Sequence, residues 1–247
     1  MNENEIVRAA QYRFDPLLHT REYRAVHADA EHLESLISLF EIRCGKSYLD
    51  LGTGNGYIAF ELARRFESAR VFGLDVAEKS IEMNRLLAKK ENLENLWFAT
   101  YRGVELPYAD GAFHGSICRY ALHHFPDINK TIEELSRIIE QDGFFIYSDP
   151  MTLDEDDVDF IDRFQSLVPD GHVHFYRRPE IEKLFSRQHF LVETEFIGSI
   201  RYPRQINRDY EDLIEHARKD LVERYMIEMA GHEIFITVPV LNILFRH

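Results

Sequence analysis

The chain has 247 residues and an apolar fraction of 45%, enough to bury one sizeable core in a single large domain or in a domain with an insertion. Its formal net charge of −14 argues against nucleic-acid binding, because nonspecific affinity for a phosphate backbone requires basic surface. Two cysteines, Cys44 and Cys118, provide neither a disulfide framework nor the spacing of a metal site. Met1–Gln11 does not read as a leader, and no apolar run reaches membrane-spanning length, so we expect a cytoplasmic protein without a membrane partner.

The first 44 residues are predicted to be mainly helical. A stripe of apolar residues at helical spacing predicts one buried face: Leu33, Leu36, Ile37 and Phe40. Before this stripe, residues 11–16 form a turn-like aromatic segment that contains Tyr12 and Phe14. We expect these two rings to pack on the core, and the alternative is that they fold over the mouth of a ligand site.

Residues 47–66 are predicted to form a buried strand, a glycine-rich turn and a helix. The strand covers residues 47–51, and the turn carries Gly52, Gly54 and Gly56 at alternating positions. Glycine allows a sharp turn and lets a ligand approach the backbone without hindrance from a Cβ atom. The turn also opens a helix N-terminus, where free N–H groups favour a negative group. This combination predicts a site for a nucleoside-containing ligand.

Strands and helices then alternate with short connections. Further strands are predicted at 70–76, 96–100, 115–120 and 144–148, and helices at 78–91 and 128–140. Such alternation predicts a parallel sheet with helices on both faces and ligands at the carboxyl ends of the strands. Asp75 lies about 20 residues beyond the glycine turn, the spacing at which an acid reaches the two hydroxyls of a ribose.

The remainder of the chain breaks this alternation. An acidic stretch and a sparse helical stripe in residues 151–178 predict a lid over the sheet edge. A helix from Pro179, a strand at 191–197, a helix at about 210–229 and a last, antiparallel strand at 233–245 complete the prediction. The fold class is therefore α/β, a Rossmann-like, doubly wound, seven-stranded sheet that is mostly parallel. The predicted divisions are a helical N-terminal cap, a cofactor-binding core, a lid insertion and a C-terminal completion of the sheet: 1–44, 45–150, 151–178 and 179–247.

Four motifs, in order and at matching spacing, carry a resemblance to a known family. They are LDLGTGNG at 49–56, GLDVA at 73–77, ELPY at 105–108 with AF at 112–113, and YALHHF at 120–125. Together they resemble class I S-adenosylmethionine-dependent methyltransferases, and most closely the small-molecule branch that includes ubiquinone/menaquinone C-methyltransferases. The likeness is close over residues 48–150 and extends beyond them only in the order of elements.

The resemblance implies S-adenosylmethionine as the cofactor and a set of residues that bind it. By this likeness the glycine turn lines the methionine and ribose, Asp50 lies near the amino group, and Asp75 accepts from both ribose hydroxyls. The full set implied is Asp50, Gly52, Thr53, Gly54, Asn55, Gly56, Asp75, Val76, Arg102, Gly103, Val104 and Tyr120.

Two positions depart from the family pattern. The family usually has Gly-Asp after the third strand, where the acid accepts from the adenine amino group, whereas this chain has Tyr101 and Arg102. Arginine only donates, so we expect the backbone at 103–104 to hold adenine, with Arg102 or Tyr101 stacked on the ring. The family's acid after Phe113 is replaced by His114.

Methyl transfer from a sulfonium is an in-line displacement, for which alignment and desolvation supply most of the catalysis. If a base is used, the candidates are His123 and His124, with His124 preferred because Leu122 should be buried and adjacent side chains face differently. The alternative is that one histidine packs internally while the other caps the next helix. His172 and His174 alternate and would share one face of a strand, but they lack a third ligand, so a lid or surface role is favoured over a metal site.

The sequence thus predicts a cytoplasmic methyltransferase acting on a small molecule, with no metal and no nucleic-acid partner. The changes at Arg102 and His114 motivate an alternative, a non-catalytic or regulatory S-adenosylmethionine-binding protein. A nicotinamide-dependent oxidoreductase is disfavoured, because the turn reads G-x-G-x-G and the chain ends in a β-rich segment. Oligomeric state and the accepting atom are not specified by the sequence.

Overall fold

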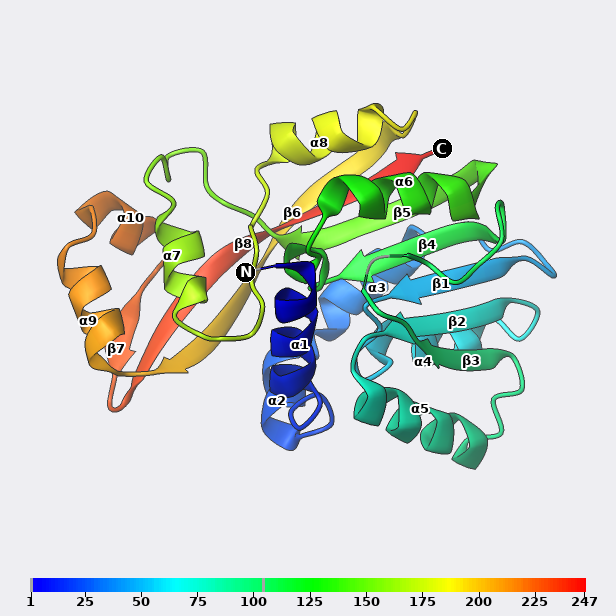
Figure 1. Ribbon diagram of the computed structural model, residues 1–247, viewed down its shortest axis with the longest axis horizontal. Coiled ribbons are helices and arrows are strands. Elements are labelled where there is room, and N and C mark those ends of the chain that lie inside the picture. Colours follow the sequence, from blue (N-terminus) through cyan, green and yellow to red (C-terminus); the bar gives the residue numbers. More distant parts are fainter. Residues whose placement is uncertain (1, 104) are drawn as a thin grey trace.

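The computed structural model describes residues 2–103 and 105–247 (Figure 1). Three helices form the N-terminal cap: α1 (Glu3–Phe14), α2 (Arg21–His27) and α3 (Ala30–Ser38). The core then follows in the order β1 (Ser47–Leu51), α4 (Tyr57–Arg65), β2 (Arg70–Asp75), α5 (Glu78–Lys90), β3 (Leu96–Thr100), β4 (Phe113–Arg119), η1 (Leu122–His124), α6 (Ile128–Ile138) and β5 (Ile139–Pro150). The chain continues with α7 (Phe160–Ser166), α8 (Arg178–Ser186), β6 (Leu191–Gln205), α9 (Arg208–Glu215), α10 (Lys219–Arg224), β7 (Glu228–Ala230) and β8 (Glu233–Arg246).

The strands form one sheet in the order β3-β2-β1-β4-β5-β8-β6, with β7 paired to β8. Neighbours from β3 to β5 are parallel, whereas β8 runs antiparallel to both β5 and β6. The order reverses between β1 and β4, and this reversal is where doubly wound sheets bind their ligands. The Rossmann-like fold with an antiparallel last strand is therefore confirmed.

Helices cover both faces of the sheet because the strand residues alternate between two apolar cores. On one face, α3, α4 and α5 pack on strand residues that include Tyr48, Val71 and Ile117. On the other face, α6 and α8 pack on residues that include Leu49 and Phe145. The predicted N-terminal stripe is buried against the first of these cores: Leu33, Leu36, Ile37 and Phe40.

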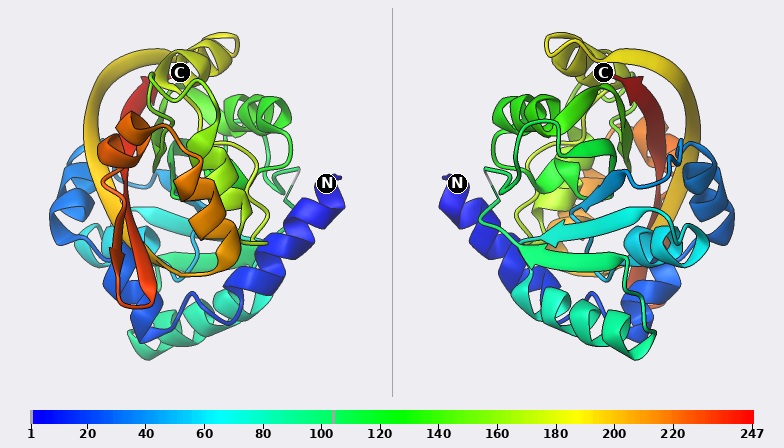
Figure 2. Two further views of the ribbon diagram at one scale, coloured as in Figure 1. Left: turned by 90° about the vertical axis from the view of Figure 1, so that its left-hand side faces the viewer. Right: turned by 90° about the vertical axis from the view of Figure 1, so that its right-hand side faces the viewer.

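A third apolar cluster lies where β6 and β8 extend beyond the parallel strands (Figures 1 and 2). Helices α7, α9 and α10 pack there, and Phe160, Tyr210 and Tyr225 are buried in the cluster. No helix within the described ranges is both long enough and apolar enough to cross a lipid bilayer.

Several element boundaries differ from the predictions. The helix predicted at 210–229 is wrong: the chain turns at 216–218, so that α9 buries Tyr210 and α10 buries Leu221 in the third cluster, and 228–230 form β7. Strand β5 begins at Ile139, five residues before the predicted strand at 144–148, because pairing with β4 begins there. Strand β6 reaches residue 205, eight residues beyond the prediction, since its full length pairs with β8.

Candidate functional site

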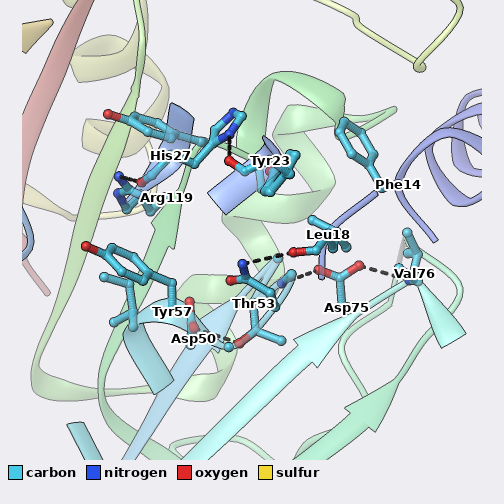
Figure 3. A pocket seen from close by; sticks show the side chains of 18 of the residues that line it. Phe14, Leu18, Tyr23, His27, Asp50, Thr53, Tyr57, Asp75, Val76 and Arg119 are labelled. Carbon is cyan, nitrogen blue, oxygen red and sulfur yellow. Dashed lines mark hydrogen bonds between the residues drawn. The ribbon is translucent and has the colours of Figure 1, made fainter. Parts of the chain in front are cut away.

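One cavity of about 460 Å³ lies at the carboxyl ends of β1, β2 and β4, beneath the N-terminal cap (Figure 3). This volume is within the range of ligand pockets, about 300–1,000 Å³. Eleven of the predicted site residues line it: Asp50, Gly52, Thr53, Gly54, Asn55, Gly56, Asp75, Val76, Gly103, Tyr120 and His124. The strand order brings these positions together although they are spread over 75 positions of the sequence.

The glycine loop and the end of β2 are joined by hydrogen bonds to one carboxylate. The Gly54 N–H donates to Asp75 Oδ2 at 2.7 Å, and the Ala77 N–H donates to Oδ1 at 2.9 Å. Gly54 has a positive φ of 53°, a conformation that favours glycine. Burial raises the pKa of Asp75 while the backbone N–H groups of Ala77 and Gly54 lower it. Each carboxylate oxygen keeps lone pairs for a ligand's hydroxyl groups.

Asp50 is a buried carboxylate that faces the same cavity from the end of β1. Its Oδ2 accepts from Thr53 Oγ1 at 2.7 Å and from the Ala59 N–H at 3.1 Å. Both donors bond to Oδ2, so Oδ1 is left for a ligand. Burial raises the pKa of Asp50 to about 6, against the lowering effect of these two hydrogen bonds. A cation in the cavity would favour the ionised form of this acid.

The N-terminal cap closes the mouth of the cavity. Gln11 Nε2 donates to the Val76 carbonyl at 2.8 Å, and Asn55 Nδ2 donates to the Leu18 carbonyl at 3.0 Å. Leu18 lies over the glycine loop, where a Cβ atom on Gly54 would stand 3.2 Å from Leu18 Cδ2. These contacts tie residues from α1 and its following turn directly to the ligand-binding loops.

The expected core packing of Tyr12 and Phe14 is wrong for both rings. Tyr12 is 86% exposed. Phe14 lines the cavity and meets His124 edge-on, with ring centroids 5.1 Å apart. The last turn of α1 places Phe14 on its cavity side, because Ile6 and Ala10 on the same side are buried beneath the helix.

Only some of the residues predicted to contact adenine lie at the cavity. Tyr101 and Gly103 line the cavity, but Arg102 is exposed and absent from the lining, because the turn after β3 directs neighbouring side chains in different directions. A Cβ atom on Gly103 would stand 2.6 Å from Val7 Cγ2 of α1, so the cap also covers this end. Val104 lies outside the described residues.

The two adjacent histidines occupy different environments. His124 lines the cavity, and its Nδ1 is buried without a hydrogen-bond partner. His123 lies behind it, away from the cavity, where its backbone N–H and its Nδ1 both contact Asp149, each at 2.9 Å. Direct contact of His123 with a ligand is therefore not supported, because Asp149 holds its ring inside the protein. The pKa of both imidazoles is lowered, mainly because burial removes the water that would solvate the charged ring.

Sequence reasoning missed several further residues that line the cavity, among them Tyr23, His27, Tyr57 and Arg119. His27 Nδ1 lies 2.8 Å from the Tyr23 carbonyl, which only accepts, so Nδ1 carries the proton and Nε2 is an acceptor. Burial lowers the pKa of His27 to about 4. Tyr23 and His27 belong to the cap, and no motif connects them to the glycine loop. Arg119 directly precedes the predicted site residue Tyr120, and that adjacency is a signal in the sequence.

His172 and His174 do converge, but on a carboxylate. His172 Nε2 and His174 Nδ1 lie 2.7 and 2.5 Å from the two oxygens of Asp162 in α7. The His172 ring lies 5.6 Å from that of His123, so this segment packs behind the histidine pair. The segment is irregular in conformation, so the two histidines do not share a face through the alternation of a strand.

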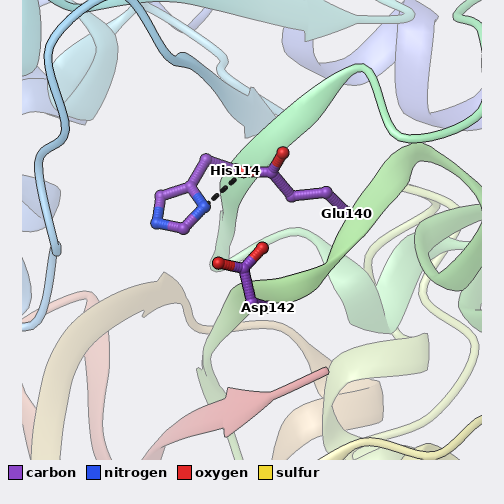
Figure 4. Close-up of side chains that lie close together, drawn as sticks. All are labelled: His114, Glu140 and Asp142. Atoms are coloured by element: carbon purple, nitrogen blue, oxygen red, sulfur yellow. Dashed lines mark hydrogen bonds and ion pairs between the residues drawn. The ribbon is translucent and has the colours of Figure 1, made fainter.

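His114 lies at the other end of β4 and is not among the residues that line the cavity. Figure 4 shows His114 beside Glu140 and Asp142. His114 Nδ1 lies 2.5 Å from Glu140 Oε1, and Asp142 is near enough for the three to share an ion. Lys46 and Arg43 already pair with these carboxylates, each at 2.7 Å. The two carboxylates are thus paired within the protein, and His114 does not line the cavity.

The sheet order, the glycine loop and the acids at the ends of β1 and β2 are typical of Rossmann-like proteins. Comparison with known proteins then gives the family. The family described as "Methyltransferase domain" matches residues 42–176, more than half of the chain. The chain therefore belongs to the methyltransferase domain family.

Relatives support this assignment. The uncharacterized methyltransferase YcgJ of Bacillus subtilis is 30% identical over 162 residues, which cover 65% of this chain and 63% of YcgJ. The demethylmenaquinone methyltransferase of Thermus thermophilus is 31% identical over 116 residues, which cover 47% of this chain and 52% of that enzyme. The alignments thus span less than two thirds of these relatives. The resemblance drawn from the motifs is confirmed.

A solved structure supports the fold. The crystal structure of YcgJ at 2.1 Å resolution superposes with a TM-score of 0.77, at 23% identity, covering 88% of this chain and 98% of YcgJ.

Proposed function

We propose that this chain transfers a methyl group from S-adenosylmethionine to a small-molecule acceptor by in-line displacement. The observation that carries the proposal is the position of Asp50 and Asp75 at the ends of adjacent strands, within one cavity that the glycine loop also lines. When bound, the cofactor supplies a methyl group already activated on a sulfonium, which the acceptor attacks in line with the carbon–sulfur bond.

The chain's own residues fit this cofactor at three points. Asp75 offers ionised oxygens to the pair of ribose hydroxyls, an arrangement of charge-assisted hydrogen bonds. Asp50 offers Oδ1 to the ammonium group, and the cationic cofactor stabilises the ionised form of this buried acid. The absence of a side chain at Gly54 lets the ligand approach the backbone beneath Leu18.

The adenine ring is assigned to the apolar end of the cavity near β2 and β3. Val76, Tyr101 and Val7 provide apolar and aromatic surface there. Burial raises the pKa of Tyr101 well above its usual range, so this phenol stays neutral. Recognition of adenine then rests on packing and backbone groups, in place of the acidic side chain that the family usually has.

Two neutral imidazoles line the cavity and supply proton acceptors. Burial lowers the pKa of His27 and of His124, so both are unprotonated at neutral pH. We assign His124 as the group that takes a proton from the acceptor, because it follows β4 at the sheet edge and packs on Phe14, which excludes water. His123 and Asp149 act behind it as positioning residues.

The acceptor is assigned to the class of small molecules on grounds of space. The cavity of about 460 Å³ has to hold the cofactor together with the acceptor, and the cap covers its mouth. A macromolecular acceptor would require the cap to leave this position. The name of the Thermus thermophilus relative adds demethylmenaquinone, a compound that still lacks the methyl group, to those worth testing.

Isothermal titration calorimetry with S-adenosylmethionine, S-adenosylhomocysteine and NAD tests the proposal. We expect saturable heat with the first two ligands and none with NAD. A panel of quinols, phenols, amines and carboxylic acids then tests turnover by formation of S-adenosylhomocysteine. Heat with NAD alone would overturn the proposal, whereas tight cofactor binding without turnover on the panel would favour a regulatory binding protein.

A further inference from the structure

Arg119 ends β4 and faces the cavity from the side opposite Asp75 (Figure 3). Its guanidinium lies between two aromatic rings, 5.1 Å from the centroid of Tyr57 and 4.0 Å from that of Tyr120. Arg119 Nη2 donates to the His27 carbonyl at 2.9 Å. The plane of the guanidinium is thus fixed by a stack and by one hydrogen bond, which is preorganisation for planar recognition.

The positive charge of Arg119 has no negative partner within the described part of the chain. No carboxylate lies within 4.0 Å of its nitrogens there, and its Nε is buried without any hydrogen-bond partner. A guanidinium has five N–H donors, and an unpaired donor in a buried position is costly. The aromatic faces stabilise the charge, but they leave the Nε–H without an acceptor.

Tyr120 adds a second sign that this corner is built for a ligand. It is one of the few residues other than glycine with a positive φ, 55°, in a chain segment that lines the cavity. A bulky residue in this conformation is strained, and such strain concentrates at functional sites. Here the strained backbone holds the Tyr120 ring against Arg119 and its hydroxyl 3.2 Å from His32 Nδ1.

We propose that Arg119 is the carboxylate receptor of this cavity. The inference rests on the proposed function and deepens it by assigning the anionic end of the ligand. A carboxylate matches the fork of N–H donors on a guanidinium and would satisfy groups that the protein leaves unpaired.

The order of strands defines how a ligand would reach Arg119. Asp75 ends β2, Asp50 lies in the neighbouring β1, and Arg119 ends β4 on the far side of β1. With about 4.8 Å between neighbouring strands, Asp75 and Arg119 stand about 10 Å apart. An amino-acid chain that starts from a ribose at Asp75 would pass its ammonium at Asp50 and end near Arg119. The carboxylate belongs either to the cofactor's amino-acid end or to the acceptor.

The first arm of the test removes the carboxylate from the cofactor product. Calorimetry compares S-adenosylhomocysteine with its decarboxylated analogue on the wild-type protein, Arg119→Gln and Arg119→Lys. If the cofactor supplies the carboxylate, the wild type should prefer S-adenosylhomocysteine by about 10- to 100-fold. Arg119→Gln should abolish this preference, and Arg119→Lys should keep only part of it, because lysine retains the charge but loses the fork.

The second arm tests the acceptor as the source. The protein saturated with S-adenosylhomocysteine is titrated with benzoate and dimethylglycine, and with the corresponding uncharged amides. If the acceptor supplies the carboxylate, the acids should bind in preference to the amides on the wild type and lose that preference in Arg119→Gln. In that case the preference for S-adenosylhomocysteine in the first arm should be unchanged by the substitution.

Arg21→Gln is the matched control. Arg21 is exposed on the same helix α2 and does not line the cavity, so its substitution removes one positive charge from the cap without changing the site. It should leave both preferences as in the wild type. Circular dichroism and the Tm establish that each variant folds, since Arg119 also supports α2 through the His27 carbonyl.

A purely structural Arg119 would weaken all ligands equally, with or without a carboxylate. Such a uniform effect, or unchanged preferences in both arms, would overturn the proposal. Failure of the wild type to bind S-adenosylhomocysteine at all would instead overturn the proposed function, so the two failures are distinguishable. The comparison of ligands on the wild type stands even if Arg119→Gln does not fold.

Discussion

The Gly54 N–H donates to Asp75 Oδ2 at 2.7 Å, which links the glycine loop to the end of the neighbouring strand. The same carboxylate accepts from the Ala77 N–H, the N-cap residue of α5. Asp75 therefore organises two ligand-binding segments while it keeps lone pairs for a ligand. Substitutions at Asp75 and at Gly54 are therefore expected to weaken cofactor binding for different reasons.

Asp75→Asn is expected to keep the fold and lose affinity for S-adenosylhomocysteine. Asparagine keeps an oxygen for only one of the two backbone donors and has no ionised oxygen for two hydroxyl groups. Loss of a charge-assisted interaction predicts an affinity about 10- to 100-fold weaker by calorimetry. 5′-Methylthioadenosine, which has the ribose but lacks the amino-acid end, serves as a second ligand and should lose the same factor. Unchanged affinity for both ligands would show that Asp75 does not bind the ribose.

Gly54→Val is expected to abolish cofactor binding in a folded protein. Valine disfavours the positive φ of 53°, and its side chain would enter the space between the loop and Leu18. Gly111→Val is a matched control, because Gly111 has a φ of 61° and no atom within 4 Å of an added Cβ. Both variants should lower the Tm through backbone strain, but only Gly54→Val should lose binding. Undiminished affinity in Gly54→Val would mean that the site lies elsewhere.

Affinity for the cofactor is expected to fall as the pH decreases below about 6. The ammonium needs an ionised Asp50, and burial raises the pKa of this acid to about 6. Below that pH, binding requires release of a proton, so affinity drops by up to about tenfold per pH unit. Asp50→Asn should bind weakly and lose this step. Since burial also raises the pKa of Asp75, Asp75→Asn is the control and should retain the step. A flat pH profile in the wild type would contradict the role of Asp50.

The raised pKa of Asp50 also predicts how stability depends on pH. The free energy of unfolding should fall as the pH rises, whereas affinity for the cofactor should increase. The pKa of Asp50 is raised in the folded state above its ordinary value of 3.8, so ionisation of Asp50 opposes folding. This group's contribution to the free energy of unfolding is greatest below pH 4 and is lost as the pH rises through about 6. Asp50→Asn should therefore raise the free energy of unfolding at pH 8 by about 2–3 kcal/mol. Urea unfolding measures this, and a less stable variant would contradict the burial of an ionised Asp50.

His124→Gln is expected to lower kcat by about 100-fold or more if proton transfer is part of the rate-limiting step. His27→Gln is the comparison, because His27 lines the same cavity and is also neutral. It should change KM more than kcat, since it belongs to the cap. Both kcat values are measured at saturating cofactor, so that a change in cofactor affinity caused by the titration of Asp50 does not affect them. A larger loss of kcat in His27→Gln than in His124→Gln would show that His27, which belongs to the cap, is the base.

The sequence was informative wherever a local pattern and a local structure coincide. The glycine turn, Asp75 and the alternation of strands and helices predicted the sheet and the ligand edge, because each depends on neighbouring residues. The aromatic segment around Phe14 was misjudged, since helix phase alone does not decide between a core and a cavity. Arg102 was assigned by position in a motif, but the turn after β3 directs it to solvent.

The cap residues Tyr23 and His27 were not predicted because only the tertiary fold brings α2 over β4. For Arg119 the sequence offers only its adjacency to Tyr120, because the role proposed for it rests on the lack of a negative partner among the described residues, which only the tertiary structure shows. The division at 216–218 was missed because the helical periodicity of the flanking residues continues across the turn. The predicted limits of the lid and of the other divisions stay predictions.

A crystal structure with S-adenosylhomocysteine tests the central claim most directly, since the claim concerns which residues meet which part of the cofactor. We expect the ribose hydroxyls within hydrogen-bond distance of Asp75, the ammonium at Asp50 and the sulfur facing the side of the cavity lined by His124. Adenine should lie against Val76 and Tyr101, beneath the cap. S-adenosylhomocysteine bound outside this cavity, or bound within it without contact to either acid, would contradict the account.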